Sequence, residues 1–367
     1  MDRRGSRCHG VVSYALAFAA VIAASSSAVA STITQNVSWT IDRSGTSTKY
    51  RVVAYGDSIY AGYEGGLFDV AVWSAPNVQG DYASNYWGTD VEVVRRCKSG
   101  AKADDIYNNK IVGEKSYMQS TNTRIVTFEM CGNDFLQARS SFAGQTGTCN
   151  YGVLSTALTN CSTYQQNAMS FINANAYSGT KLKVIANIYY PGYNADNKLS
   201  SCTDSGTGQK VNLRDKFLPY LAKSNWRACN YANTYGFKCA DTFANFMGAD
   251  YDSNGDGQVD SDALKYVQGE TESAYVTRIT VTLKSTLRDA NTHFATASTS
   301  YDYIQSDDTH PTYDGGIVGL SLFGNGSGSA PPDFTPSQFV NGKNPVWNQF
   351  GHERMGWGLS TYNPATP

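Results

Sequence analysis

Charged residues are scarce in this chain of 367 residues. Lysine, arginine, aspartate and glutamate make up 16% of it, against about 25% in ordinary globular proteins. The formal net charge is −2, so the composition predicts no basic surface for nucleic acid or for an anionic membrane. Tyrosine, asparagine, serine, threonine and glycine supply the polar surface instead, which fits an exported protein.

A long apolar run is also missing. The apolar stretch at residues 11–24 is too short for a comfortable transmembrane helix. Basic residues precede this stretch, and a small-residue A-V-A sequence follows it and ends at Ala30. This pattern is typical of a cleaved leader. We therefore expect residues 1–30 to be a signal peptide and the mature chain to be secreted, either extracellular or periplasmic, without a transmembrane segment. An uncleaved anchor is the alternative.

No Cys-x-x-Cys pair is present, which argues against a zinc site. Apart from the cysteine in the leader, the cysteines are Cys97, Cys131, Cys149, Cys161, Cys202, Cys229 and Cys239. An exported chain with this many cysteines suggests structural disulfides, and their odd number leaves at least one free or paired with another chain. From proximity in sequence we expect Cys149 to pair with Cys161, and two of Cys202, Cys229 and Cys239 to pair with each other.

Strand-like and helix-like segments alternate along the chain. Apolar runs rich in β-branched residues predict strands at 50–55, 91–94, 124–130, 182–190 and 237–241. Helices are predicted at 103–108, 153–176 (preceded by Asn150 as a cap) and 213–234. This alternation predicts an α/β fold with a parallel sheet and helices on both sides.

The segments outside this alternation differ in composition. Residues 31–48 are rich in serine and threonine and are expected to be a flexible or edge segment. Residues 242–300 read as an insertion, with an Asp/Asn/Gly loop and then a helix around 274–290. Residues 323–367, rich in Gly, Pro, Trp and Asn, are expected to wrap the surface of the domain formed by residues 49–322.

The tripeptide Gly-Asp-Ser ends the first predicted strand and places Ser58 at the turn that follows. In open parallel sheets, chemistry gathers at the carboxyl ends of the strands. Gly56 permits a sharp turn, and a serine at the start of the next helix lies near exposed backbone N–H groups. These features favour Ser58 as a nucleophile. The alternative is a plain turn residue.

A serine nucleophile needs a base, and histidine is nearly absent. Without the leader only His293, His310 and His352 remain. Asp307 precedes His310 by three residues, and Pro311 follows it. This spacing lets the carboxylate hold the imidazole ring, so His310 is the predicted base. A surface loop pair is the alternative. His293 lies in a predicted helix, and His352 lacks an aspartate at that spacing.

An oxyanion needs convergent hydrogen-bond donors. Gly100 and Asn133 follow the second and third predicted strands and are the candidates. Gly100 is also suited to a turn, and Asn133 to the N-cap of a helix. Asp57 and Asp134 are interpreted as structural turn and cap groups.

Four stretches of the chain, GDSIYAG, SGAKADDI, CGND and DDTHP, occur in this order between residues 50 and 320. In these stretches the chain resembles the SGNH (GDSL-type) serine hydrolase superfamily. The resemblance implies a flavodoxin-like three-layer α/β/α sandwich with a central parallel sheet, and residues 49–322 would form the hydrolase domain.

The resemblance also implies a role for each candidate residue. Ser58 would attack an ester carbonyl, and His310 would take its proton and pass it to the leaving alcohol. Asp307 would orient His310. The backbone N–H groups of Ser58 and Gly100, with the side-chain amide of Asn133, would hold the oxyanion. No cofactor is implied for catalysis.

One position departs from the family pattern. Where the family usually has a glycine two residues before the asparagine, this chain has Cys131. Asn133 itself is in place. A bridge between Cys131 and Cys97, which lies just before Gly100, would brace two of the oxyanion donors and is our hypothesis for this departure.

An acidic loop within the insertion resembles calcium loops of the EF-hand and dockerin type. Its candidate ligands are Asp252, Asn254, Asp256, Gln258 and Asp260. Gly257 lies where such loops turn sharply, but Ala263 occupies the twelfth position, where an acid normally completes the shell. We expect one structural Ca²⁺ here. A metal-free turn is the alternative.

The function predicted from these observations is a secreted serine hydrolase that cleaves carboxylic esters, of the esterase or lipase type. Its substrate would be a lipid, an aryl or alkyl ester, or an acetylated glycan. Aromatic side chains expected near Ser58 are Tyr60, Tyr63, Phe68, Tyr86 and Trp87. The alternatives are a polysaccharide O-acetyl esterase and a non-catalytic extracellular carbohydrate-binding protein. The oligomeric state cannot be read from the sequence.

Overall fold

A computed structural model of the chain describes residues 33–42, 49–63, 74–189, 198–247, 262–287, 309–311 and 359. All of them belong to one compact unit that spans Thr32–Pro367. The predicted signal peptide lies outside the described residues, as does the predicted surface tail except for Leu359. In the described part of the chain, no helix combines the length and the apolar character that a membrane span requires.

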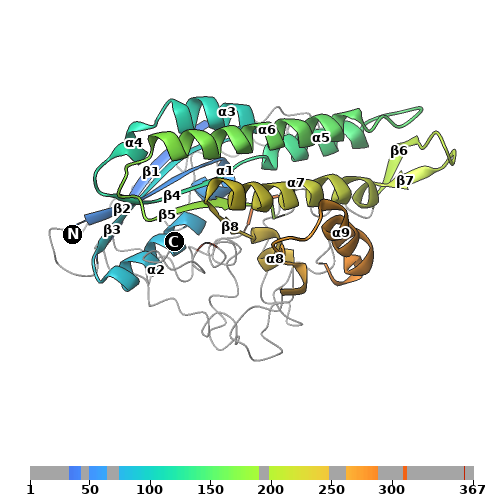
Figure 1. Ribbon diagram of the computed structural model, residues 1–367. Helices are drawn as coiled ribbons and strands as arrows, with labels where there is room; N and C mark the ends of the chain where they lie inside the picture. The colour runs from blue at the N-terminus through green and yellow to red at the C-terminus, as the bar shows by residue number, and fades with distance from the viewer. Residues whose placement is uncertain are drawn as a thin grey trace, which may run out of the picture. The chain divides into compact units, whose positions relative to one another are not determined.

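Strands and helices alternate through most of the described part (Figure 1). The strands are β1 (Ile33–Ile41), β2 (Lys49–Gly56), β3 (Asp90–Ser99), β4 (Thr123–Glu129), β5 (Leu182–Ala186), β6 (Leu199–Thr203), β7 (Lys210–Asn212) and β8 (Lys238–Ala240). The α-helices are α1 (Ser58–Ala61), α2 (Ala75–Trp87), α3 (Ala103–Asp105), α4 (Ser116–Gln119), α5 (Gly132–Ala143), α6 (Gly152–Asn175), α7 (Leu213–Tyr235), α8 (Thr242–Met247) and α9 (Glu272–Thr277). Short π- and 3₁₀-helical segments are η1 (Ile106–Val112), η3 (Asp262–Leu264), η4 (Arg278–Thr282) and η5 (Lys284–Thr286).

The central sheet has six strands in the order β1-β3-β2-β4-β5-β8. Strand β1 pairs antiparallel with β3, and the other five strands are parallel. Numbered along the chain, the five parallel strands follow the order 2-1-3-4-5, which is that of flavodoxin-like sheets. The predicted α/β fold with a parallel sheet is therefore confirmed. The strand order reverses between β2 and β4, where ligands bind in such sheets.

Helices cover both faces of the sheet and make three layers (Figure 1). Helix α2 packs on β1, β2 and β3, where Gly80 lies so close to Val93 that a Cβ atom would clash at 2.3 Å. On the other face η1, α6 and α7 pack against one another in series. Successive residues of β3 point to opposite faces: Arg95 donates to Ser74 Oγ at the start of α2 (2.7 Å), and Arg96 pairs with Glu114 beyond η1.

Several predicted boundaries differ from the structure. Strand β5 ends at Ala186 rather than at residue 190, because the backbone N–H and C=O of Ile188 bond to the side chain of Asn225 on α7 (2.9 and 2.8 Å) instead of to a strand. The predicted helix at 103–108 is α3 followed by the π-helical η1. The predicted helix around 274–290 begins earlier as α9, at Glu272, and continues as η4.

Two disulfides join Cys149 to Cys202 and Cys229 to Cys239. The expected pair of Cys149 and Cys161 is wrong, because the backbone N–H of Cys149 donates to the carbonyl of Thr203 (2.8 Å), which holds Cys149 beside β6. Cys161 is buried on α6 as a free thiol. The expectation that two of Cys202, Cys229 and Cys239 pair is confirmed.

Removing the two disulfides separately should destabilise the protein by different amounts. The Cys149–Cys202 bond spans 53 residues and the Cys229–Cys239 bond spans 10. Loop-closure entropy predicts that the double serine variant costs about 4 kcal/mol of unfolding free energy for the first bond and about 3 kcal/mol for the second. Urea denaturation of the two double variants measures this. A larger loss from the shorter loop would contradict the entropic account.

Candidate active site

The turn after β2 places Ser58 at the switch point of the sheet. Asp57 is the N-cap of α1, and its Oδ1 accepts a hydrogen bond from the backbone N–H of Ile59 (2.8 Å). Helix α1 is a single turn that ends at Gly62 with φ 77°. Ser58 is the first residue of this turn and is 6% exposed. The Gly-Asp-Ser sequence therefore presents a serine hydroxyl at the carboxyl end of the central strand.

His310 lies against this serine, although 252 residues separate the two in sequence. Its Nε2 atom is 2.8 Å from Ser58 Oγ, within hydrogen-bond distance. The ring of Tyr63 packs on the imidazole with 4.3 Å between ring centroids. The hydroxyl of Tyr189 donates to the carbonyl of Thr309, the residue before His310. The structure thus brings together the two residues predicted as nucleophile and base.

Tyr63 was predicted only as a pocket residue, and no role was predicted for Tyr189. Tyr189 follows β5 at the edge of the sheet where Ser58 follows β2. Its position near the end of a predicted parallel strand could have identified Tyr189 as a site residue, because the carboxyl ends of parallel strands lie at one edge of the sheet.

Asn133 and the Gly100 turn meet at the same edge. The Asn133 amide Nδ2 donates to Asp57 Oδ2 (2.8 Å) and to the carbonyl of Ala101 (3.1 Å). Gly100 directly follows β3 and has φ 73°, a conformation that glycine adopts without strain. The alternative interpretation of Asn133 as a helix cap is wrong, because Cys131 occupies the N-cap position of α5. Asn133 is thus bonded to Asp57, the residue before Ser58, and to Ala101, the residue after Gly100.

Other predicted site residues lie outside the described part of the chain. They are Asp307, the rival histidines His293 and His352, and the calcium-loop residues Asp252, Asn254, Asp256, Gln258 and Asp260. The orienting role of Asp307 and the structural Ca²⁺ stay predictions.

The aromatic residues expected around Ser58 are not all placed there. Tyr60 is fully buried in the core. The Tyr86–Trp87 pair ends α2, and the Trp87 ring packs edge-on against Tyr50 near the start of β2, with 5.2 Å between centroids. That is the end of the sheet opposite Ser58, so the expectation is wrong for Tyr86 and Trp87, whereas Tyr60 lies on α1 with Ser58. Tyr63 lies at the site, and Phe68 is outside the described residues.

Asp134 caps a helix other than its own. Its Oδ2 accepts a hydrogen bond from the backbone N–H of Ala103 (2.8 Å), at the start of α3. This agrees with its interpretation as a structural cap. Burial raises the pKa of Asp134 to about 7, although the Ala103 N–H opposes that shift.

Replacing Asp134 by asparagine should therefore raise stability at alkaline pH. Between the unfolded pKa near 4 and the folded pKa of about 7, the native state binds more protons than the unfolded state, so the free energy of unfolding falls as pH rises. Asp134→Asn should match the wild type near pH 4 and exceed it by on the order of 3 kcal/mol at pH 8. Denaturant unfolding across this range measures the difference, with Asp42→Asn at an exposed position as control. A difference independent of pH would contradict the assignment.

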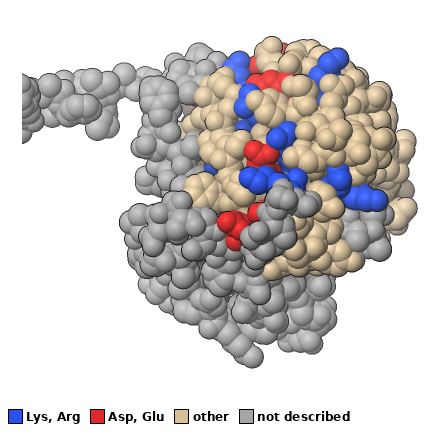
Figure 2. Space-filling model, turned by 90° about the vertical axis from the view of Figure 1, so that its left-hand side faces the viewer, with Lys and Arg blue, Asp and Glu red and all other residues tan. Residues whose placement is uncertain are grey.

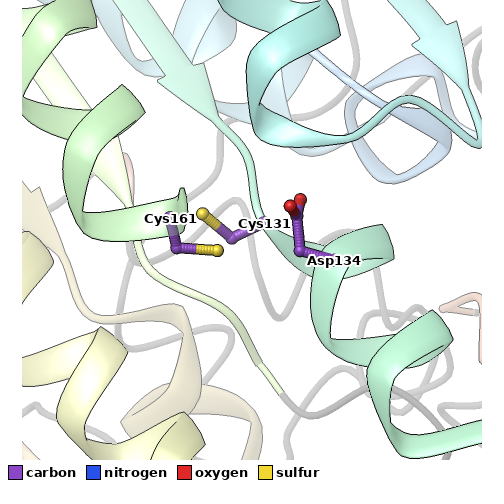
Figure 3. A group of neighbouring side chains, drawn as sticks. All are labelled: Cys131, Asp134 and Cys161. Atoms are coloured by element: carbon purple, nitrogen blue, oxygen red, sulfur yellow. The ribbon is translucent and has the colours of Figure 1, made fainter. Parts of the chain in front are cut away.

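Cys131 has φ 86° and is the one non-glycine residue of the described part with a positive φ. Glycine, which the family usually has here, takes this conformation without strain. The predicted Cys97–Cys131 bridge is wrong: both thiols are free and buried, and the Cys131 thiol hydrogen-bonds with that of Cys161 on α6 (Figure 3). The first turn of α5, which carries Asn133, therefore packs on α6 next to a thiol pair.

Among the described residues, one group of three side chains could bind a metal ion by residue type and distance. It consists of Cys131, Asp134 and Cys161, whose ligand atoms lie within 4.8 Å of one another (Figure 3). Burial raises the pKa of the Cys131 thiol well above its usual range and that of Cys161 to about 11. Metal binding needs thiolates, and Asp134 already accepts from Ala103. The arrangement therefore favours a protonated thiol pair over a metal centre.

No protein-family model and no curated protein matches the chain. Among solved structures it is similar to phospholipase A1 from Streptomyces albidoflavus NA297 (17% identity, TM-score 0.40), covering 65% of this chain and 99% of that one. An extracellular lipase from Streptomyces rimosus shows 18% identity and a TM-score of 0.39, with 65% and 99% covered. An acetylxylan esterase from Geobacillus stearothermophilus shows 15% identity and a TM-score of 0.34, and the match covers 56% of this chain and 79% of that one. In its four motif stretches and in the order of its parallel strands, the chain resembles the SGNH hydrolases.

Proposed function

We propose that this chain hydrolyses carboxylic esters, with Ser58 as nucleophile and His310 as general base. The observation that carries the proposal is the distance of 2.8 Å between Ser58 Oγ and His310 Nε2. A serine hydroxyl is a weak nucleophile at its own pKa, and a hydrogen-bonded base at this distance is the usual means of activating it.

The reaction follows from this geometry. Ser58 Oγ attacks the carbonyl carbon while His310 Nε2 takes the hydroxyl proton. The tetrahedral intermediate collapses, and the imidazolium returns the proton to the departing alcohol oxygen. Water then attacks the acyl-enzyme, with His310 again as base, and releases the carboxylic acid.

Backbone and side-chain donors are available for the oxyanion. Ser58 begins α1, so its backbone N–H is among those left without a partner within the helix. The N–H of Gly100 and the amide of Asn133 are the other proposed donors. Since the Asn133 amide already donates to the carbonyl of Ala101 at 3.1 Å, a bound oxyanion would compete with that carbonyl.

Further parts of the proposal rest on the sequence. Asp307, three residues before His310, is the proposed partner that orients the imidazole. The two disulfides support an exported protein, since such bonds persist in oxidising compartments. An esterase or lipase acting without a cofactor is the activity proposed.

A panel of p-nitrophenyl esters from acetate to palmitate tests this proposal. Hydrolysis by the purified mature chain, with loss of activity after treatment with a fluorophosphonate, is the expected result. Peptide mapping should place the phosphonyl group on Ser58. The chain-length profile would separate a lipase-like from an acetylesterase-like enzyme. Absence of hydrolysis and of labelling would contradict the proposal.

A further inference from the structure

The carboxyl group of Glu129 lies beside the Gly-Asp-Ser turn, and Glu129 belongs to none of the four motif stretches. Glu129 is the last residue of β4 and follows Phe128, which pairs with Tyr55 of β2. Its side chain is buried. Its Oε1 atom accepts a hydrogen bond from the backbone N–H of Asp57 at 2.6 Å. Glu129 therefore holds the residue directly before Ser58.

The glycine of Gly-Asp-Ser makes room for this carboxyl group. A Cβ atom on Gly56 would lie 2.4 Å from Glu129 Oε1 and 2.9 Å from the Cβ of Tyr60. Contacts this short are not tolerated, so Gly56 cannot carry a side chain while Glu129 is in place. The turn and the carboxyl group thus fit together as one unit.

Asp57 contacts both Glu129 and the other site residues. Its carboxyl group receives hydrogen bonds from the Ile59 N–H (2.8 Å) and from the Asn133 amide (2.8 Å), and it also hydrogen-bonds with the Glu129 carboxyl group. Asp57 also interacts electrostatically with His310. A shift of Asp57 would therefore disturb the serine turn and the amide proposed for the oxyanion together.

Two carboxyl groups can hydrogen-bond only when one of them carries a proton. Burial, and then the neighbouring charge of Asp57, raise the pKa of Glu129 well above its ordinary value. Burial raises the pKa of Asp57 as well, but the hydrogen bonds from the Ile59 N–H and from Glu129 oppose that shift. Among the described residues, the groups that interact electrostatically with Glu129 include, besides Asp57, the side chains of Tyr60, Cys97 and Cys131, all neutral when protonated. The proton thus belongs on Glu129, and Asp57 is the carboxylate.

We propose that Glu129 is a positioning residue that acts as a neutral carboxylic acid. It accepts from the Asp57 backbone N–H, donates its O–H to the Asp57 carboxylate, and through Asp57 fixes both Ser58 and the amide of Asn133. This inference rests on the proposed ester hydrolysis.

The test compares Glu129→Gln with Glu129→Ala. Glutamine keeps an acceptor for the Asp57 N–H and a donor for its carboxylate, so kcat and KM should stay within about threefold of the wild type. Alanine removes both bonds, and kcat should fall about 100-fold while KM changes less than about threefold, as when an oxyanion donor is lost. Glu92→Ala is the matched control, because Glu92 lies on β3 in a partly exposed ion pair with Arg51.

Equal losses in the glutamine and alanine variants would overturn the proposal, because they would show that the ionised carboxylate is required. Full activity in the alanine variant would overturn it as well. Where the alanine variant fails to fold, the glutamine variant and an infrared measurement decide. The wild type minus Glu129→Gln difference spectrum at neutral pD should contain the C=O stretch of a protonated carboxylic acid, and its absence would refute the neutral acid.

The infrared measurement needs no substrate and therefore separates two kinds of failure. A wild-type protein that hydrolyses no ester and takes no phosphonate label contradicts the proposed function. The same protein with the protonated carboxyl band would still have Glu129 holding Asp57 as inferred. An active wild type without that band would contradict the inference about Glu129 alone.

Discussion

Ser58→Ala should lower kcat/KM for every hydrolysed ester by about four orders of magnitude or more. The variant loses the oxygen that forms the acyl-enzyme, while the binding surface and the oxyanion donors stay in place. Any residual rate would come from water attacking an ester that is bound in the site. Steady-state hydrolysis of the best p-nitrophenyl ester from the panel measures the loss.

The fold should survive this change. Ser58 contributes one hydroxyl whose hydrogen-bond partner is His310, so the free energy of unfolding should change by about 1 kcal/mol. Ser155→Ala, at an exposed position on α6, is the matched control and should keep full activity. Intact activity in Ser58→Ala would show that another group is the nucleophile. A wild type without esterase activity, and with equal polysaccharide binding in both proteins, would favour the carbohydrate-binding alternative.

The strands at the centre of the sheet were predictable because they are buried on both faces. The runs that became β2 and β4 contain the apolar and β-branched segments VVAY and IVTF, and most of their residues are buried, as in parallel central strands. The long helices α6 and α7 were found within one residue of their observed ends. In these segments the local composition matches the burial that each segment has in the fold, so the sequence alone predicts the type of secondary structure.

Helix α2 shows why other elements were missed. Its sequence contains Gly80 and several residues of low helix propensity, which mask the helix start that Ser74 and Pro76 indicate. Gly80 is needed for contact with Val93 on β3, which is a property of the packed structure. Strand β1 was expected only as a flexible or edge segment, and its antiparallel pairing with β3 could not be read from its serine- and threonine-rich sequence.

The site divides in the same way. Ser58 and His310 were predicted as partners because a nucleophile needs a base and the chain offers few histidines. Glu129 was not predicted as a site residue, because it lies in a run that is predicted only as a strand. Its contact with Asp57 depends on the register that pairs β4 with β2, which the sequence does not show. Figure 2 shows the charged side chains on one face of the molecule, and these do not indicate the site, since Glu129 and Asp57 are buried.

His310→Ala should lower kcat/KM by about four orders of magnitude, similar to the loss in Ser58→Ala. Without the imidazole, Ser58 keeps its proton at neutral pH and the leaving alcohol receives none. The rival histidines provide the controls: His293→Ala and His352→Ala should each stay within about threefold of the wild type. A large loss in His352→Ala together with an active His310→Ala would reassign the base.

The double variant Ser58→Ala/His310→Ala gives the sharper test of a shared role. If the 2.8 Å contact joins a nucleophile to its base, removing both should cost no more than removing either one, because each single change already disables the same step. Independent contributions would multiply instead, and the double variant would then fall well below both single variants. A residual rate equal in all three proteins is the expected result. Multiplied losses would mean that His310 serves binding or stability separately from Ser58.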